Sequence, residues 1–572
     1  MCGILGVTNF DDKSVIKSML DTLKKRGPDD SSIYINNKLS LGHTRLSIID
    51  IKKGQQPIYN ENRSVMVIFN GEIYNYKKLR KDLIKKRHKF RTNSDTEVLV
   101  HLWEEYQQDM VKYLDGMFAF CIYDLHNEVI YLARDHAGIK PLFYSELDNN
   151  FVFGSEIKTI LKSNLISSKV DDMALIQYLR LGHCLDGNTM ITNIVSLQPG
   201  NSLLYNLNTK KTIIRDHNDF KKLYNFDAQN VARYNLDYIL NDSVELNMES
   251  DVPVGSFLSG GLDSSLVTAM MKQHVDKINT FSIGLDGNDE SEHAETVADH
   301  VGTNHHSYHV TKEEIIKNIE PVLKYNCDCI GDLATVPTYI LSKNASKRVK
   351  VVLTGEGADE NFGGYKRYNQ PFFFPVSLKK KLYLRYLTLF GETHLQRYVG
   401  DRYRFCHDKS LNIGADNCLD TTQFNIQSIT HFERYGYLSN NLLIKTDRMS
   451  SAHGLEARVP YLNKSVVNFS YDLHARLKNN KNLLKSVARK YLPDTIINRQ
   501  KHGFSVPLNQ YILDGFDIVS KIDKSVLNKL NIDNKIVIDH QPINNKFRRS
   551  ADHHRLWRLF VLTNWYNNYV VE

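Results

Sequence analysis

The sequence predicts two domains of different fold class, an α+β domain followed by an α/β domain with a doubly wound parallel sheet. A chain of 572 residues exceeds what one hydrophobic core usually organises. Up to about residue 205, short segments alternate apolar and polar side chains with a period of two, which indicates strands. From about residue 231, helical segments alternate with short, mostly apolar strands, which is typical of a parallel sheet covered by helices.

Composition and charge exclude several classes of protein. With 42% hydrophobic and 24% charged residues, the chain has the composition of a soluble globular protein. It contains no apolar run of about 18 residues and no signal-peptide pattern, so we expect a cytoplasmic protein without a membrane partner. The seven cysteines form no Cys-x-x-Cys pair that would indicate a zinc or redox site. A net charge of +8 is small for this length, and we expect no nucleic-acid partner.

The first chemical candidate is Cys2, directly behind the initiator methionine. Removal of Met1 would leave one residue with both a thiol and a free α-amine. An α-amine titrates near ~7.7–8, so it can accept the thiol proton at neutral pH. Taken alone, a cysteine at this position more often has no catalytic role.

Five polar stretches follow Cys2 in a fixed order, at strand ends and turns. Residues 64–69 and 118–123 are predicted strands. The stretches are Arg26–Asp29, Arg45–Asp50, Asn70–Asn75, Ser94–Glu97 and Gly116–Phe120. Together with Cys2 they resemble the class II glutamine amidotransferase domain. That resemblance implies an N-terminal-nucleophile hydrolase fold, in which two antiparallel sheets are sandwiched between helices (αββα).

The polar residues of these stretches suit a glutaminase. The guanidinium of Arg45 suits the α-carboxylate of glutamine, and Glu72 and Asp95 offer negative charge to its α-ammonium. The amide of Asn70 and the backbone N–H of Gly71 can form an oxyanion hole beside the carbonyl that the Cys2 thiol attacks. As separate residues, Arg45 would more simply form a surface ion pair, and the acids would be ordinary turn residues.

The glutaminase domain is expected to cover residues 1–205. A polar segment rich in Asn, Lys and Asp follows, and residues 206–230 are interpreted as a linker. The second domain then covers residues 231–572.

A glycine turn organises this second domain. The predicted strand 252–258 ends at Ser259-Gly260-Gly261-Leu262-Asp263-Ser264-Ser265, and a helix follows. Glycine backbone, hydroxyls and a helix N-terminus favour bound phosphate, but the Gly-Lys-Ser/Thr ending of a P-loop is absent. The turn resembles the PP-loop of N-type ATP pyrophosphatases. The resemblance implies that Ser259, Gly261, Asp263 and Ser264 bind pyrophosphate and that Asp263 binds Mg²⁺. The simpler alternative is a Ser/Gly turn that only begins a helix.

Two further strands, 278–285 and 350–354, end in turns that should lie at the same edge of the sheet. With the segment 445–462, this part resembles the synthetase domain of glutamine-hydrolysing asparagine synthetase. The resemblance implies nucleotide contacts from Leu258, Ile283, Thr354 and Gly355. It also implies a role for Glu356 in acyl-adenylate formation or proton transfer, and Asp359 as a second Mg²⁺ ligand. The family's catalytic lysine falls on Lys481, although Lys478 or Lys485 would fit after a shift of one helical turn.

The two resemblances together imply a glutamine-dependent ligase that uses ATP and Mg²⁺. Cys2 would release ammonia from glutamine, and the second domain would convert aspartate and ATP into β-aspartyl-AMP, giving asparagine, glutamate, AMP and pyrophosphate. A related amidotransferase acting on a uronic acid of a surface polysaccharide remains an alternative, as does a glutaminase that has lost synthesis. No motif bears on assembly, for which a homodimer is the working hypothesis. Neither the ammonia path nor the role of residues 366–425 can be derived from the sequence.

Overall fold

The computed structural model describes residues 1–218, 229–286, 289–368, 375–400, 425–499, 506–544 and 546–570. Its N-terminal part contains two six-stranded antiparallel sheets. The first sheet has the order β10-β8-β9-β1-β3-β2. Its strands are β1 (Gly3–Thr8), β2 (Asp30–Ile35), β3 (Leu39–Arg45), β8 (Phe143–Glu146), β9 (Phe151–Gly154) and β10 (Val195–Ser196). Strand β1 lies between β9 and β3, so the sheet fixes the position of Cys2, the residue directly before β1.

The second sheet has the order β12-β11-β7-β6-β5-β4. Its strands are β4 (Ile58–Tyr59), β5 (Val65–Ile73), β6 (Gly116–Asp124), β7 (Val129–Arg134), β11 (Asn201–Asn206) and β12 (Thr212–Asp216). Strands β5 and β6 pair along nine residues, from Val65 opposite Asp124 to Ile73 opposite Gly116. This long pairing holds Asn70, Gly71 and Glu72 in a rigid strand.

Alternate side chains of β5 point to opposite faces of its sheet, which shows how the layers of this domain are stacked. Met66 and Ile68 pack into the core between the sheets, together with Ile4 of β1. Val67 and Phe69 point to the opposite face, where they meet α2 (Tyr76–Lys85) and α3 (Glu97–Tyr106). On the outside of the first sheet lie α1 (Lys13–Asp21), α4 (Ile157–Leu161) and α5 (Asp172–Leu181). The predicted αββα sandwich is confirmed.

Strand β12 lies in the segment that the sequence indicated as linker. It pairs with β11 from Asn201 opposite Asp216 to Tyr205 opposite Thr212, and so extends the second sheet. Polar residues are tolerated there because β12 is an edge strand with exposed side chains. Residues 219–228 of the expected linker lie outside the described residues.

The C-terminal part contains a five-stranded parallel sheet in the order β15-β14-β13-β16-β17. Its strands are β13 (Val254–Phe257), β14 (Asn279–Leu285), β15 (Asn304–Val310), β16 (Val351–Leu353) and β17 (Glu456–Arg458). The chain starts at the central strand β13, moves outward through β14 and β15, and then crosses to β16 on the other side. The carboxyl ends of β13, β14 and β16 therefore border the switch point where such sheets bind ligands.

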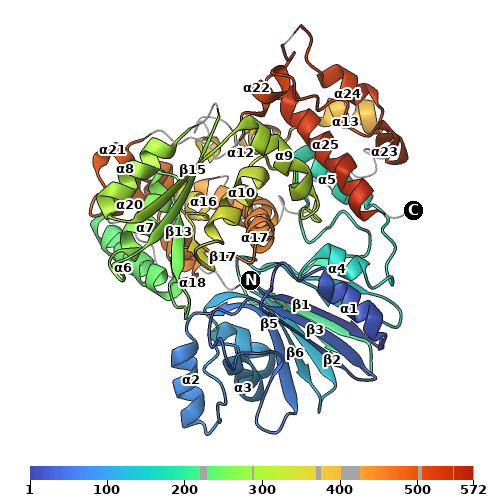
Figure 1. Cartoon of the computed structure of the whole chain (residues 1–572), viewed down its shortest axis with the longest axis vertical. Helices are drawn as coiled ribbons and strands as arrows, with labels where there is room; N and C mark the ends of the chain where they lie inside the picture. The colour runs from blue at the N-terminus through green and yellow to red at the C-terminus, as the bar shows by residue number, and fades with distance from the viewer. Residues whose placement is uncertain are drawn as a thin grey trace.

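Helices cover both faces of this sheet (Figure 1). One face packs against α6 (Gln229–Asn247), α7 (Leu262–Met271), α8 (Ser291–Val301), α18 (Lys464–Asp472) and α20 (Asn482–Ala488). The other packs against α9 (Lys312–Leu323), α10 (Thr335–Ala345) and α17 (Leu443–Ser451). This arrangement confirms the doubly wound α/β prediction.

The helices α13 (Glu392–Val399), α22 (Leu508–Leu513), α23 (Lys524–Lys529), α24 (Lys535–His540) and α25 (Asp552–Tyr569) continue the core of the second face. The helices α12 (Val376–Leu387) and α16 (Ile426–Glu433) meet in a small separate core. The short helices α11 (Ala358–Phe362), α19 (Ala475–Lys478) and α21 (Asp494–Ile497) contribute to the core of the first face. Of the segment 366–425, residues 369–374 and 401–424 lie outside the described residues. Within the described part of the chain, no helix is long and apolar enough to cross a membrane.

Candidate functional site

A small cavity lies beside Cys2 in the N-terminal part. Four predicted glutamine-site residues line it with Cys2, namely Arg45, Gly71, Glu72 and Asp95. They come from the ends of β3 and β5 and from the turn before α3, as expected for polar residues at strand ends. The cavity holds about 20 Å³, room for roughly one water molecule.

Asn70 does not line this cavity, but its side chain has the property that an oxyanion hole needs. It is fully buried, and neither its amide nitrogen nor its oxygen has a hydrogen-bond partner within the described residues. Leaving a buried amide unpaired costs about 1–3 kcal/mol, so such a group indicates a ligand. Beside it, Gly71 has φ +153°, and a Cβ there would lie 2.0 Å from the carbonyl oxygen of Met117. Only glycine fits this position of the strand pair.

The guanidinium of Arg45 is held by backbone carbonyls. It donates to the carbonyl oxygens of Ile49, Asp50 and Ile51 at 2.8–3.1 Å. An arginine has five N–H donors, so these bonds leave part of its fork for a carboxylate. The side chain is buried, which rules out the surface ion pair considered above.

The two acids of the cavity differ in their partners. Asp95 accepts a hydrogen bond from the backbone N–H of Ile73 at 2.9 Å, and burial raises its pKa to about 6. Glu72 lies 3.0 Å from Nη2 of Arg458, which belongs to β17 of the other domain. Burial raises the pKa of Glu72, against the opposing charge of Arg458. Sequence reasoning missed this arginine, because nothing in the segment 456–458 indicates a contact with residue 72.

Met1 occupies the space on the other side of Cys2. It is 1% exposed, and burial lowers the pKa of its amino group to about 5. The charged groups around this amine include Glu456, Lys140 and Arg26. Burial also raises the pKa of the Cys2 thiol, so the thiol needs a nearby base to become a nucleophile. The chain begins at the junction of the two domains (Figure 1).

Buried ion pairs join the domains at this junction. Arg26 donates two hydrogen bonds to Asp447 of α17, at 2.6 and 3.0 Å, and one to Glu156 at 3.1 Å. Arg448, next along α17, lies 3.7 Å from Glu156 across the junction and pairs with Asp328 of its own domain at 2.6 Å. Burial alone would raise the pKa of Glu156, but the positive charges of Lys158, Arg448 and Arg26 lower it to about 2. A bidentate contact of this kind fixes the relative orientation of its two residues, so it holds the glutamine cavity in a fixed position relative to the parallel sheet.

A second cavity, of about 430 Å³, lies at the carboxyl ends of β13, β14 and β16. Most of the predicted nucleotide-site residues line it: Leu258, Ser259, Asp263, Ser264, Ile283, Thr354, Gly355, Glu356 and Asp359. Its volume is in the range of small-molecule sites. The cavity combines an apolar side with a side of hydroxyls and carboxylates, as a nucleotide requires.

The glycine turn after β13 is closely packed. Gly260 has φ +69°, and a Cβ there would lie 2.5 Å from the backbone of His293. The hydroxyl of Ser264 lies 3.0 Å from that of Ser259 and accepts a hydrogen bond from the Ser259 N–H at 3.2 Å. A Cβ on Gly355 would lie 2.7 Å from the nitrogen of Ser264, so the turn after β16 rests directly on this loop. Gly261 belongs to the turn but does not line the cavity.

Lys481 closes one end of this site, although it is not part of the cavity wall. Its Nζ lies 2.6 Å from Asp263 Oδ2 and 2.7 Å from Asp359 Oδ1. These two acids raise the pKa of the lysine against the opposing effect of burial. Two carboxylate oxygens thus converge on one cation position, which suits the hard oxygen donors that Mg²⁺ prefers. The contacts also favour Lys481 over Lys478 and Lys485.

Three residues at the far end of the cavity were not predicted: Asp332, Lys445 and Thr446. The hydroxyl of Thr446 donates to Glu356 Oε1 at 2.6 Å, and Lys445 Nζ lies 3.8 Å from both Glu356 and Asp332. Burial raises the pKa of Glu356, opposed by Lys445. Asp332 lies in a loop without a motif, so no sequence signal pointed to it. Lys445 and Thr446 lie in the segment 445–462, whose roles the sequence left open.

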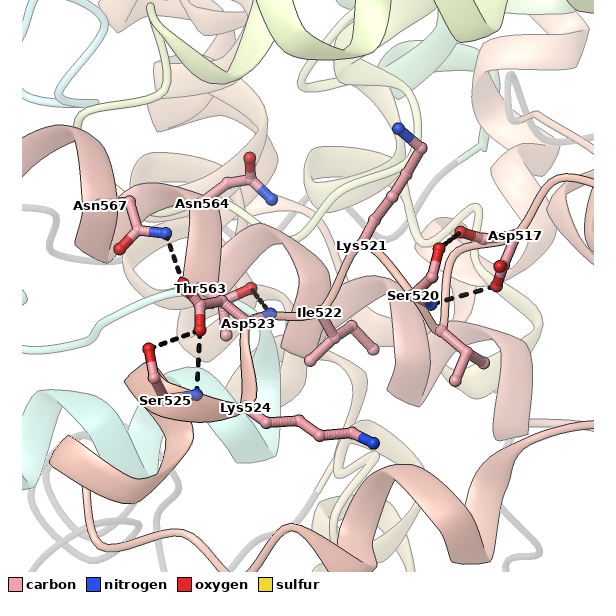
Figure 2. Close-up of a pocket in the computed structure, with 11 residues that line it drawn as sticks. Asp517, Ser520, Lys521, Ile522, Asp523, Lys524, Ser525, Thr563, Asn564 and Asn567 are labelled. Carbon is pink, nitrogen blue, oxygen red and sulfur yellow. Dashed lines mark hydrogen bonds between the residues drawn. The ribbon is translucent and has the colours of Figure 1, made fainter.

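A larger hollow, of about 720 Å³, lies among the C-terminal helices (Figure 2). Residues 517–525 and α25 line it, and none of the predicted site residues is among them. Several of its polar groups bond to one another: the Ser525 hydroxyl and the Asn567 amide donate to Asp523, and the backbone N–H of Ser520 donates to Asp517. It is open to solvent and carries none of the chemistry described above.

Comparison with known proteins identifies the family. Residues 235–567 match the family model described as asparagine synthase, and residues 1–217 match the glutamine amidotransferase domain. The chain belongs to the asparagine synthase family. Both cavities fall within these matches, one in the glutamine amidotransferase domain and one in the asparagine synthase domain.

Relatives from a bacterium, an archaeon and a plant match two thirds or more of the chain. Asparagine synthetase [glutamine-hydrolyzing] 1 of Bacillus subtilis is 32% identical, over 99% of this chain and 96% of that protein. A putative asparagine synthetase of Methanocaldococcus jannaschii is 36% identical, over 67% and 79%. Asparagine synthetase 2 of Oryza sativa is 31% identical, over 90% and 78%. The family assignment therefore covers both domains in their order.

Proposed function

We propose that the protein is a glutamine-hydrolysing asparagine synthetase. The observation that supports it best is the pair of cavities in one molecule, one beside a nucleophilic thiol and one built for a nucleotide. The relatives named above carry this activity in their names. A non-synthetic glutaminase is disfavoured because the second cavity retains Glu356, Asp263 and Asp359.

In the glutamine amidotransferase domain, Cys2 attacks the side-chain amide carbon of glutamine after Met1 is removed. The freed α-amine takes the thiol proton and passes it to the leaving ammonia, and a γ-glutamyl thioester forms. Asn70 and the N–H of Gly71 stabilise the oxyanion, while Arg45 holds the α-carboxylate. Asp95 and Glu72 face the α-ammonium. Water then hydrolyses the thioester and releases glutamate.

In the asparagine synthase domain, ATP lies over the glycine turn. Ser259, Gly261 and Ser264 bind its pyrophosphate portion, and Leu258, Ile283, Thr354 and Gly355 contact the nucleoside. Mg²⁺ held by Asp263 and Asp359 would neutralise the triphosphate charge. The ammonium of Lys481 lies between these acids in this structure; once Mg²⁺ takes their oxygens, it would turn to the α-phosphate and stabilise the charge there when the acceptor carboxylate attacks. AMP is thereby joined to the acceptor, and pyrophosphate leaves.

The acceptor is aspartate, bound at the end of the cavity formed by Asp332, Lys445 and Glu356. Lys445 offers a cation to a carboxylate, and Asp332 offers an anion to the α-ammonium. A uronic acid has no ammonium group, so it would leave the negative charge that Asp332 adds to the cavity unused. Glu356 accepts the proton of the attacking ammonia. Because ammonia released to water is mostly protonated, a protected path between the cavities is required.

The test is to incubate the protein with glutamine, ATP and Mg²⁺, with either aspartate or a sugar acid, and to measure AMP and the amide product. Aspartate-dependent AMP and asparagine are expected. AMP that depends only on a sugar acid would reject the aspartate assignment. Cys2→Ala should abolish glutamine-dependent synthesis but retain synthesis from ammonium. Asp263→Ala should retain glutaminase activity and lose AMP formation; retention of AMP formation would reject its role.

A further inference from the structure

Two histidines and two glutamates meet on the glutamine amidotransferase domain, outside both cavities. Glu61 lies in the turn between β4 and β5, and His88 follows α2. His101 and Glu104 lie one turn apart on α3. One donor atom from each of the four lies within 4.8 Å of all the others. None of these residues lines either candidate site.

The donor atoms are spaced like the ligands of a four-coordinate metal. Glu104 Oε2 lies 3.3 Å from His101 Nδ1 and 3.5 Å from His88 Nδ1. The carboxylate of Glu61 lies 3.6 Å from His101 Nδ1 and 3.7 Å from His88 Nδ1. Tetrahedral zinc with bonds of about 2.0–2.1 Å separates its ligands by about 3.4 Å. The four separations between a histidine and a glutamate are therefore close to this value, and the remaining two separations are no longer than 4.8 Å.

We propose that Glu61, His88, His101 and Glu104 form a structural zinc site. Two imidazoles and two carboxylates match the ligand types that tetrahedral zinc accepts, whereas Mg²⁺ and Ca²⁺ prefer oxygen ligands alone. Histidine spacing of this kind gives no sequence motif, because the ligands come from three segments. The absence of a Cys-x-x-Cys pair from the sequence therefore does not bear on this cluster of histidines and glutamates.

Groups behind the cluster orient His88 and Glu104 toward its centre. His88 Nε2 lies at hydrogen-bond distance, 3.0 Å, from Glu105 Oε1, whereas the carboxylate nearest to His101 Nε2, that of Glu97, is 3.9 Å away. Carboxylates on the far nitrogen are the usual support of zinc-bound histidines. Glu104 Oε1 accepts a hydrogen bond from Asn60 at 2.8 Å, which turns its Oε2 toward the two histidines.

Charge and burial agree with a bound dication. Four glutamates, at positions 61, 97, 104 and 105, surround the two imidazoles. Lys86, which donates a hydrogen bond to Glu105, adds one cation. His101 is completely buried, so the site is fixed on its inner side. The side chains of Glu61 and Glu104 are 31% and 28% exposed, which gives an ion access from solvent. Bound zinc would link the β4–β5 turn and the segment directly after α2 to α3.

The experiment is a metal titration of the full-length chain. The protein is stripped with a chelator, dialysed into excess Mg²⁺ to fill oxygen-only sites, and titrated with Zn²⁺ or Co²⁺. The Cys2→Ala variant is used as background, so that its thiol takes no metal. We expect one tightly bound equivalent, the visible absorption of tetrahedral Co²⁺, and a higher melting temperature with Zn²⁺.

The ligand variants are His101→Gln and the more exposed Glu104→Gln, with Glu320→Gln on α9 as an exposed control. Both ligand variants should lose the Co²⁺ absorption and the tight equivalent, and the control should keep them. Ammonium-dependent synthesis verifies that each variant is folded. Equal binding by Glu104→Gln and the control, or no binding tighter than micromolar in the parent, would overturn the proposal and leave an ordinary cluster of ion pairs.

Discussion

Arg458 Nη2 lies 3.0 Å from Glu72 Oε1, and the pair connects the two domains at the glutamine cavity. The same guanidinium pairs with Glu456 through Nε at 2.9 Å and donates through Nη1 to the carbonyls of Asn247 and Glu249. One side chain thus joins the end of α6, strand β17 and the wall of the other domain's cavity. Both members of the pair are buried, so neither charge can be solvated if the other is lost.

Arg458→Met should destabilise the protein by about 3–5 kcal/mol, because it leaves Glu72 as an uncompensated buried acid and leaves Glu456 with Lys140, 3.8 Å away, as its remaining ion-pair partner. Urea unfolding measures this change. The control is Arg489→Met: this arginine is 60% exposed and lies 3.8 Å from its acid, so a change of about 0.5 kcal/mol or less is expected. Equal midpoints for the two variants would contradict the importance of the Arg458 pair.

Asn70→Ala should lower the glutaminase turnover number by about 10²–10³, the usual effect of losing one oxyanion donor. The KM for glutamine should change little, because this amide acts on the transition state. Asn36→Ala, which removes a partly buried amide bonded to Tyr34, provides the matched control. Synthesis from ammonium should remain in both variants. A purely raised KM in Asn70→Ala would instead place this amide in ground-state binding.

The KM for glutamine should rise as the pH falls below 6. Burial raises the pKa of Asp95 to about 6, so its carboxylate is ionised above this pH and neutral below it. At pH 5 about one-tenth would remain ionised, which predicts a KM roughly tenfold above that at pH 7.5. Glutamine itself does not titrate in this range.

Asp95→Asn should have a high KM that no longer depends on pH between 5 and 7.5. Asp242→Asn is the control, since burial also raises the pKa of Asp242 but this residue does not line the cavity. A normal pH profile in Asp95→Asn would assign the titration to another group, and the role of Asp95 would be rejected.

Lys481→Met should reduce aspartate-dependent AMP formation by at least about 10²-fold, because the α-phosphate loses its cation. Lys485→Met, one turn along α20, should retain most activity. Glutaminase activity should persist in both variants. A larger loss in Lys485→Met would show that the lysine assignment is shifted by one turn.

Local sequence patterns predicted the main elements because their causes are local. Residues 64–69 and 118–123 are nearly continuously apolar because β5 and β6 are packed on both faces, with alternate side chains in two different cores. The turn at residues 259–265 was recognisable because strand, glycines and helix start are adjacent in the chain. Each predicted nucleotide-site residue lies in or directly after a strand that could be recognised locally, and nearly all of them line one cavity.

Contacts between distant segments were not predictable. The choice of Lys481 over its neighbours depends on Asp263, 218 positions away in the chain. Strand β17 has three residues, too few for a periodic pattern, and its side chains meet the other domain. Asp332 has no neighbouring motif. Such residues carry no signal until the fold brings their partners together.

The buried position of Met1 gives its excision a second effect. Its sulfur lies 3.9 Å from Nη2 of Arg26, and its amino group lies near the charges of Glu456 and Lys140. Cleavage of one peptide bond would thus vacate a buried volume the size of a thioether chain next to the nucleophile. Maturation would create the catalytic amine and unfilled space beside the thiol in a single step.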